Sequence, residues 1–148
     1  MQPLVLDASV LIKWVVPPDS ETHVEQAYAL QREIAWRNRD VVLPALWFFE
    51  VGNTLGRRFP DHAESQLARL MSMGFRQAEQ RRILAPALEL VRRHGVTFYD
   101  AAYHATALAY GGVLVTSDQR YLDAAASAGN ILALVQWPLG DAVSKNES

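Results

Sequence analysis

The sequence has no cysteine among its 148 residues, which excludes disulfide frameworks, thiol catalysis and zinc–thiolate sites. It also has no cationic leader, since the opening MQPLVLD reaches an acid at Asp7. No uninterrupted apolar run is long enough to cross a membrane. From these absences we expect a cytoplasmic protein without a membrane segment, because a chain free of cysteine suits a reducing compartment.

Several motifs of cofactor and metal enzymes are missing as well. The sequence contains neither a Walker loop nor a dinucleotide-binding glycine pattern, and its four histidines form no pair at i, i+4. The net charge of −2 argues against a nucleic-acid partner, but residues 57–93 hold eight arginines against four acids. Charged faces of solvated helices would give the same bias, so charge alone leaves the partner open.

The composition that remains is that of a soluble globular domain, with 50% hydrophobic and 20% charged residues. A chain of this length is sized for one domain, and no linker or repeat divides it. We therefore predict a single domain over residues 1–139 and a polar tail, GDAVSKNES, over residues 140–148.

Short apolar runs alternate with helical patterns along the chain. The runs 4–6, 41–43, 113–115 and 131–135 are typical of buried parallel strands, and 75–83 is a weaker candidate. Helices are predicted over 9–16, 20–37, 45–58, 61–71, 85–94, 100–110 and 119–128. Asp19 and Ser20 are predicted to cap the helix over 20–37, and Asp61 with Glu64 is predicted to form a capping box at the start of 61–71. This alternation predicts an α/β fold with a mostly parallel sheet.

Two aspartates follow apolar runs directly, at the points where the predicted strands end. Asp7 follows 4–6, and Asp118 follows 113–115 after Thr116 and Ser117. In open α/β sheets, functional sites lie beyond the carboxyl ends of the strands. Helix capping is the simpler explanation for either residue alone, whereas two acids at equivalent positions favour a shared acidic rim.

Two further acids stand out from their surroundings. Glu50 lies in a helical segment, ALWFFEVGNTL, that is apolar on nearly every side, and burial of an unpaired carboxylate is costly. Asn53, three residues later, lies on the same helix face and is a candidate to support Glu50. Asp100 opens the alanine-rich segment DAAYHATALAY. The alternatives are a solvent-exposed edge for Glu50 and helix capping for Asp100.

Four acids on one rim would repel each other unless a cation compensates them. A set of ligands made only of oxygen selects Mg²⁺ or Mn²⁺, and such a site can activate water for attack on a phosphate. Lys13 and Arg120 lie close in sequence to Asp7 and Asp118 and are candidates to meet phosphates, although a solvated surface role is the simpler expectation.

Taken together, these segments resemble the PIN-domain ribonucleases and, within them, the VapC toxins of bacterial VapBC toxin–antitoxin pairs. The segments that carry the resemblance are VLDAS with Lys13-Trp14, PAL through EVGN (residues 44–53), YDAAY (residues 99–103) and LVTSD (residues 114–118). Each fragment is weak alone, but four in this order on an α/β background make a specific signal over nearly the whole chain.

The resemblance implies a three-layer α/β/α sandwich with a central, mostly parallel sheet, and a pocket for one or two Mg²⁺ or Mn²⁺ ions. By motif, Asp7, Asp100 and Asp118 match the metal-ligating aspartates, and Glu50 matches an acid that ligates directly or through water. Ser9, Asn53 and Thr116 match supporting polar positions. The implied activity is endonucleolytic cleavage of RNA (tRNA, rRNA or mRNA) by metal-activated water. A VapB-type antitoxin and a homodimer are the implied partners.

Some relatives carry a further acid just after the fourth aspartate, and here the nearest is Asp123, which we leave outside the metal site. Two other functions remain open from the residues alone. A phosphoacceptor signalling domain also places aspartates around Mg²⁺, but it needs a late lysine, and the only lysine after Lys13 is Lys145. A non-catalytic α/β interaction domain would use the same acids only as helix caps.

Overall fold

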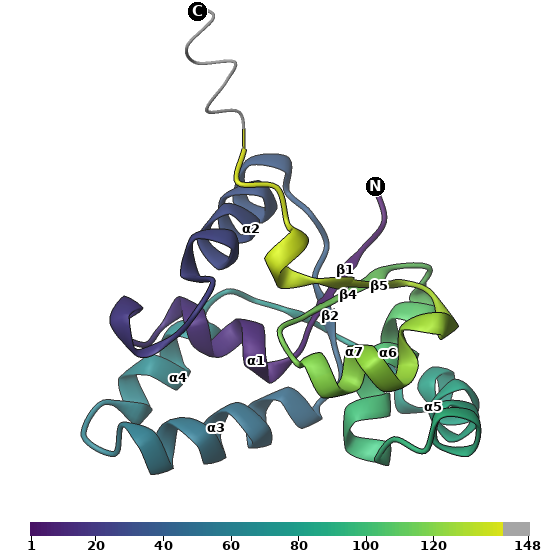
Figure 1. The fold of residues 1–148 in the computed structure, drawn as a ribbon. Helices are drawn as coiled ribbons and strands as arrows, with labels where there is room; N and C mark the ends of the chain where they lie inside the picture. The colour runs from purple at the N-terminus through teal and green to yellow at the C-terminus, as the bar shows by residue number, and fades with distance from the viewer. Residues whose placement is uncertain (141–148) are drawn as a thin grey trace, which may run out of the picture.

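The computed structural model describes residues 1–140, and a parallel sheet lies at its centre (Figure 1). Its strands are β1 (Leu4–Leu6), β2 (Val42–Leu43), β3 (Arg76–Gln77), β4 (Val113–Thr116) and β5 (Ile131–Ala133). β4 lies between β1 and β5, β2 pairs with β3, and a single parallel bridge between Leu4 and Val41 joins the two groups. The strands therefore run in the order β3-β2-β1-β4-β5, all parallel.

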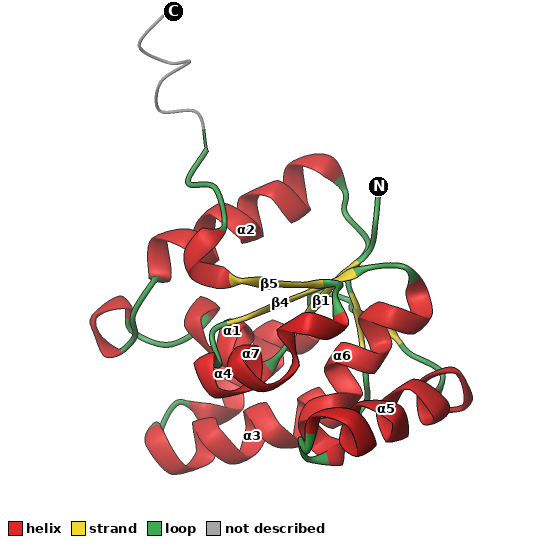
Figure 2. Ribbon diagram, turned by 45° about the vertical axis from the view of Figure 1, so that its right-hand side comes forward, coloured by secondary structure: helices red, strands yellow, loops and turns green. Residues whose placement is uncertain are grey.

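Helices cover both faces of this sheet. They are α1 (Ala8–Leu11), α2 (Val24–Arg37), α3 (Leu46–Arg58), α4 (Ala63–Met71), α5 (Gln80–His94), α6 (Phe98–Tyr110) and α7 (Gln119–Ala125). Short 3-10 turns are η1 (Ile12–Trp14), η2 (Pro18–Ser20), η3 (Ala126–Ala128) and η4 (Leu134–Gln136). α2 lies on one side of β1, β4 and β5, and α5, α6 and α7 lie on the other (Figure 2). The predicted three-layer α/β/α sandwich is confirmed.

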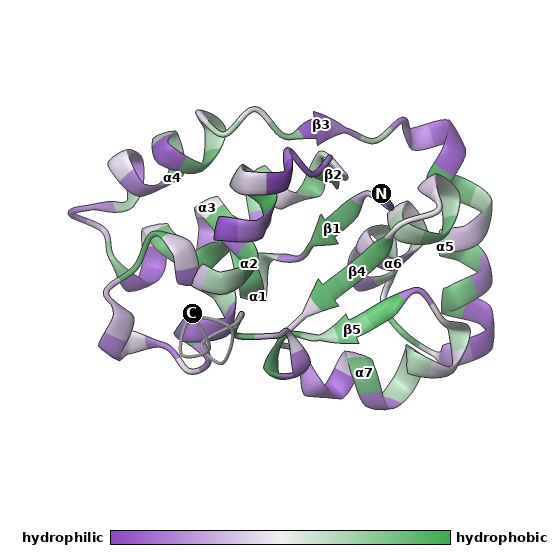
Figure 3. Ribbon diagram, turned by 90° about the horizontal axis from the view of Figure 1, so that it is seen from above, coloured by the Kyte–Doolittle hydropathy of each residue, from purple (hydrophilic) through white to green (hydrophobic). Residues whose placement is uncertain are grey.

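The sheet and α6 form the buried centre of the molecule. The strands β1, β4 and β5 are its most apolar segments, while the outer helices alternate polar and apolar residues (Figure 3). α6 buries seven consecutive residues, Ala101–Ala107, because its alanines let the helix approach β1 and β4 closely. Gly112 allows β4 to begin beside the N-terminal segment, since a Cβ there would lie 2.4 Å from the carbonyl oxygen of Pro3.

The predicted start of α5 is wrong, because a contact distant in sequence decides this boundary. α5 begins at Gln80, not at residue 85, and the weak strand 75–83 shrinks to β3. The first turn of α5 is held by α6: the Tyr110 hydroxyl accepts a hydrogen bond from the Glu79 amide (2.8 Å), and the Arg82 guanidinium stacks 3.7 Å above the Tyr110 ring.

Two predicted caps are also wrong. α2 begins at Val24 after His23, which has a left-handed backbone (φ 53°), so Asp19 and Ser20 lie in η2 instead. α4 begins at Ala63 after His62, with no side-chain cap, so the predicted capping box at Asp61 does not form. The helices themselves exist as predicted, because their apolar stripes pack against the core.

The predicted tail, residues 140–148, lies outside the described residues apart from Gly140. Within residues 1–140, no helix combines the length and apolar character that crossing a bilayer requires.

Candidate functional site

Four carboxylates from four elements line one small cavity at the carboxyl ends of β1 and β4. Asp7 follows β1, Glu50 lies on α3, Asp100 on α6, and Asp118 follows β4. The cavity has a volume of about 100 Å³, and Ala8, Ser9, Tyr103, Leu114 and Tyr121 complete its lining. β1 and β4 are hydrogen-bonded neighbours in the sheet, so their ends place Asp7 and Asp118 side by side. The structure thus brings together the four acids that the sequence singled out.

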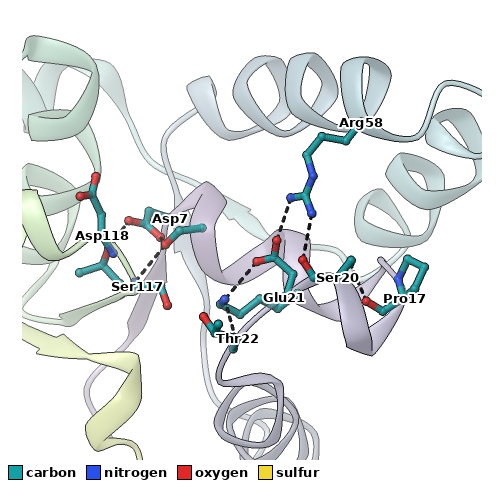
Figure 4. A network of polar contacts seen from close by, with 11 residues as sticks. Asp7, Pro17, Ser20, Glu21, Thr22, Arg58, Ser117 and Asp118 are labelled. Carbon is teal, nitrogen blue, oxygen red and sulfur yellow. Dashed lines mark hydrogen bonds and ion pairs between the residues drawn. The ribbon is translucent and has the colours of Figure 1, made fainter.

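The Asp7 carboxylate is held by two hydroxyl groups. Ser9 Oγ donates to Asp7 Oδ1 at 2.5 Å, and Thr116 Oγ1 donates to Asp7 Oδ2. Each hydroxyl in turn accepts a backbone N–H, from Ser117 to Ser9 and from Asp118 to Thr116, both at 3.0 Å. Figure 4 shows Asp7, Ser117 and Asp118 in this network. Because each hydroxyl has one proton, both point at Asp7 and fix its orientation.

The pKa of Asp7 is raised to about 6, mainly by burial and also by the nearby charge of Asp118, while the hydrogen bonds from Ser9 and Thr116 oppose the shift. Burial also raises the pKa of Asp100, and Asp118 again reinforces the shift, while the Thr97 hydroxyl and the charge of Arg120 oppose it. The pocket therefore holds more negative charge than its own side chains compensate, which is the electrostatic condition for binding a cation.

Helix capping explains these acids only in part. One oxygen of Asp118 accepts the Tyr121 N–H at 3.1 Å and caps α7, which leaves the other carboxylate oxygen free of the cap. α6 is capped by Thr97, whose hydroxyl accepts the backbone N–H of Asp100 at 3.1 Å. α1 has no side-chain cap from Asp7. The carboxylates of Asp7 and Asp100 are thus available to the pocket.

Glu50 is half-buried, and its Oε1 is a buried atom without a hydrogen-bond partner among residues 1–140. Tyr103 lines the same pocket, and its buried hydroxyl also lacks a partner there. Burial raises the pKa of Glu50, and the nearby Tyr103 hydroxyl opposes the shift although the two groups do not complete a hydrogen bond. A buried polar atom left unpaired is costly, so Glu50 and Tyr103 lie beside the cavity without the partners that buried polar atoms usually have.

The donor set fits a hard divalent cation, because carboxylate oxygens are the ligands that Mg²⁺ and Mn²⁺ prefer. In the part of the chain that the structure describes, however, no group of three or more His, Asp or Glu side chains is arranged to hold a metal ion. The four carboxylates share a cavity without forming a preassembled ligand cluster.

Asn53, Asp123 and Arg120 lie outside the pocket lining, as we expected of Asp123. Asn53 is exposed on α3 and does not line the pocket, so no contact of the described residues supports its predicted role beside Glu50. Asp123 is exposed and accepts a hydrogen bond from Gln119 (2.7 Å), in keeping with its place outside the site. Arg120 is exposed but close enough to lower the pKa of Asp100.

The prediction that Lys13 meets a phosphate, or is solvated, is wrong. Lys13 is 3% exposed, and its ammonium group lies 3.1 Å from Glu21 and donates to the Thr22 carbonyl at 2.7 Å. Glu21 also accepts from Arg58 at 2.8 Å (Figure 4). Lys13 is the only lysine of residues 1–140, and Lys145, the late lysine that a phosphoacceptor interpretation needs, lies outside the described residues.

The arginine-rich segment 57–93 is also less basic in the fold than in the sequence. Ion pairs join four of its eight arginines, 58, 76, 92 and 93, to Glu21, Asp40 and Glu89.

The structure adds two tyrosines and a histidine that the sequence did not indicate. Tyr103 and Tyr121 line the pocket, and His104 is fully buried against Tyr121. Each tyrosine lies three residues after an acid of the site, at Asp100 and Asp118, a spacing that places both on one helix face. This spacing is the feature of the sequence from which the two tyrosines could have been predicted to line the site.

Comparisons with known proteins agree with this geometry. The sequence pattern of the PIN domain family matches residues 4–127. Ribonuclease VapC3 of Pyrobaculum aerophilum is 31% identical over 125 residues, which cover 79% of this chain and 90% of that protein.

Two solved structures share the fold. The crystal structure of PAE2754 from Pyrobaculum aerophilum is 25% identical, with a TM-score of 0.59 over 90% of both chains. The structure of FitAB bound to an IR36 DNA fragment has a TM-score of 0.62 over 94% of this chain and 99% of that one, and at 16% identity it supports the fold alone. From the family match and the identity to Ribonuclease VapC3, the chain belongs to the PIN domain family and is of the VapC type.

Proposed function

We propose that this protein is a Mg²⁺- or Mn²⁺-dependent endoribonuclease that acts as the toxin of a toxin–antitoxin pair. The observation that carries the proposal is the single cavity lined by the carboxylate residues Asp7, Glu50, Asp100 and Asp118. These four residues would hold the ion. When bound, a divalent ion activates water and neutralises the charge that develops on a phosphate.

The residues around the cavity favour water over a side chain as the nucleophile. Ser9 is the serine that lines the cavity beside Asp7, and its Oγ is occupied, since it donates to Asp7 and accepts from the Ser117 amide. Ser9 and Thr116 act as positioning residues, because they hold Asp7 in one orientation before any ligand arrives. Attack by water on the phosphate would leave a 5′-phosphate product.

RNA is the proposed substrate because the VapC-type relative is a ribonuclease by name. Arg120 is exposed, and its charge lowers the pKa of Asp100, so it is a candidate to meet a phosphate at the pocket. We expect RNA binding to weaken with rising salt, since phosphate contacts release counterions.

The proposed partners are a VapB-type antitoxin and a second copy of this chain. Support for a protein-binding surface comes from exposed apolar side chains on three helices: Phe49 on α3, Leu84 and Leu88 on α5, and Phe98 and Tyr99 on α6. Leu84, Phe98 and Tyr99 also line an apolar hollow of about 370 Å³. We assign this surface, the α3–α5–α6 face, to the homodimer.

Cleavage of a single-stranded RNA tests the proposed activity. We expect cleavage with Mg²⁺ or Mn²⁺, none with EDTA, and a loss of more than about a hundredfold in Asp7→Asn, because outer-shell changes alone cost about 10- to 100-fold. Asp123→Asn is the matched control, since it removes an exposed carboxylate from α7 outside the cavity. Activity of Asp7→Asn equal to the control, or cleavage that persists in EDTA, would contradict the proposal.

A further inference from the structure

The fully buried His104 makes two hydrogen bonds that together determine its protonation. Its Nε2 lies 2.6 Å from the carbonyl oxygen of Gly129, and its Nδ1 lies 2.8 Å from the hydroxyl oxygen of Tyr121. A carbonyl oxygen can only accept a hydrogen bond, so Nε2 carries the proton. Burial lowers the pKa of His104 and keeps the ring neutral. Nδ1 is therefore an acceptor.

It follows that the Tyr121 hydroxyl donates its one proton to His104. This matters because Tyr121 lines the acidic cavity, and the charges of Asp7 and Asp100 both reach its phenol group. A tyrosine hydroxyl beside carboxylates would otherwise donate to one of them and occupy an oxygen that a cation needs. With the proton turned toward His104, the Tyr121 oxygen can only accept hydrogen bonds from the cavity.

We propose that His104 is a positioning residue that acts through Tyr121 and makes the Tyr121 oxygen an acceptor for a water molecule carried by the divalent cation in the acidic pocket. The inference rests on the proposed function. A cavity of about 100 Å³ has room for an ion with a few waters but not for a nucleotide base and its ribose. In this proposal, the Tyr121 oxygen helps to align a hydrated ion among the carboxylates. His104 fixes the direction of the Tyr121 hydroxyl proton, so that this oxygen faces the ion as an acceptor.

The first experiment determines the tautomer of His104. Two-bond ¹H–¹⁵N correlation spectra of the metal-free protein should show one histidine with protonated Nε2 and bare Nδ1, and its signals should disappear in His104→Gln. In Tyr121→Phe, the Nδ1 shift should move toward the value of an unbonded ring nitrogen. A proton on Nδ1, or an Nδ1 chemical shift that is the same in Tyr121→Phe as in the wild-type protein, would overturn the inference.

The second experiment measures the Mn²⁺ dissociation constant by electron paramagnetic resonance, with the melting temperature of the metal-free protein as a check on folding. We expect Tyr121→Phe to weaken Mn²⁺ binding about tenfold, as loss of an outer-shell partner does. Tyr110→Phe is the matched control, because it also removes a hydroxyl that forms a hydrogen bond, here with the Glu79 amide outside the cavity.

Two substitutions of His104 separate its two hydrogen bonds. His104→Gln can retain a donor toward Gly129 but loses the acceptor for Tyr121, whereas the amide oxygen of His104→Asn can replace Nδ1. We expect His104→Gln to weaken Mn²⁺ binding as Tyr121→Phe does, the double variant to be no weaker than either, and His104→Asn to recover part of the loss. Additive losses in the double variant would overturn the inference, since His104 would not act through Tyr121.

The two proposals fail in different ways. A wild-type protein that binds no Mn²⁺ at millimolar concentration would overturn the proposed function, and this inference with it. A wild-type protein that binds Mn²⁺ with the same affinity as Tyr121→Phe would overturn only the inference.

Discussion

At the residue scale, Asp7 connects the stability of the protein to its site. Its pKa is about 6 in the folded state, against 3.8 for an ordinary aspartate, mainly because it is buried. Between these two values the folded state binds more protons than the unfolded state, so the free energy of unfolding falls as pH rises from about 4 to 6. A shift of this size corresponds to about 3 kcal/mol.

We therefore predict that Asp7→Asn stabilises the metal-free protein at pH 7 by up to about 3 kcal/mol and that its advantage disappears near pH 4. Asparagine keeps an oxygen for one of the two hydroxyl donors and removes the repulsion by Asp118. Urea unfolding in EDTA between pH 4 and 7.5 measures the difference, with Asp123→Asn as the control. A difference that is independent of pH would contradict the assignment of the shift to Asp7.

The sequence indicates residues of the site where a local pattern determines their position. Asp7 and Asp118 follow short apolar runs, so the parallel sheet alone brings them together. Lys13 could not be placed in this way, because its burial depends on Glu21 and Thr22 beyond a proline-rich turn. The predicted contact between Asn53 and Glu50 is missing for a related reason. Spacing along a helix shows that two residues share a face, but not whether both of them reach the pocket.

At the scale of single elements, the N-terminus of α6 determines where Asp100 lies. Thr97 caps the helix by accepting the Asp100 N–H, so the Asp100 carboxylate is left to the pocket. We predict that Thr97→Ala lowers the free energy of unfolding by about 1 kcal/mol and also weakens Mn²⁺ binding, because the first turn of α6 frays. Thr97→Ser keeps the hydroxyl and should restore both. Urea unfolding and Mn²⁺ titration measure the two effects, and a Thr97→Ser variant as poor as Thr97→Ala would argue against capping.

The existence and order of the elements follow from the sequence, whereas their ends often do not. The apolar runs and stripes that predict strands and helices are the same residues that build the core. The start of α5 depends instead on Tyr110, about 30 residues later in the chain, whose ring and hydroxyl hold Arg82 and Glu79. Such a contact has no counterpart in any local window of sequence.

At the scale of the whole molecule, the α3–α5–α6 face makes a prediction about assembly. We expect the wild-type protein to be a dimer by size-exclusion chromatography with light scattering. Leu84→Asp should give a monomer, because it places a charge in the apolar hollow that Leu84 lines with Phe98 and Tyr99. Val135→Asp changes an aliphatic residue of similar exposure on η4 and should remain a dimer. A monomeric wild type would contradict the assignment of this face.

The ion-pair network of Glu21 joins parts of the molecule that are far apart in sequence. Glu21 contacts Lys13 on η1. It also contacts Arg58 (Figure 4), which lies at the end of α3, the helix that carries Glu50. Lys13 is almost fully buried, whereas Arg58 is 37% exposed in its side chain. Loss of one partner from a buried pair leaves a desolvated charge, but an exposed partner contributes little. The two ends of the network should therefore differ in their effect on stability.

We predict that Glu21→Ala lowers the free energy of unfolding by about 3 kcal/mol, because Lys13 is then left in the interior with only the Thr22 carbonyl as a hydrogen-bond partner. Arg58→Ala should cost less than about 1 kcal/mol. The double variant Lys13→Met/Glu21→Ala removes the buried charge together with its partner, so it should be more stable than Glu21→Ala alone. Urea unfolding of the four proteins at pH 7 measures the series. If the double variant is less stable than Glu21→Ala, Lys13 stabilises the fold by packing and not as half of a buried ion pair.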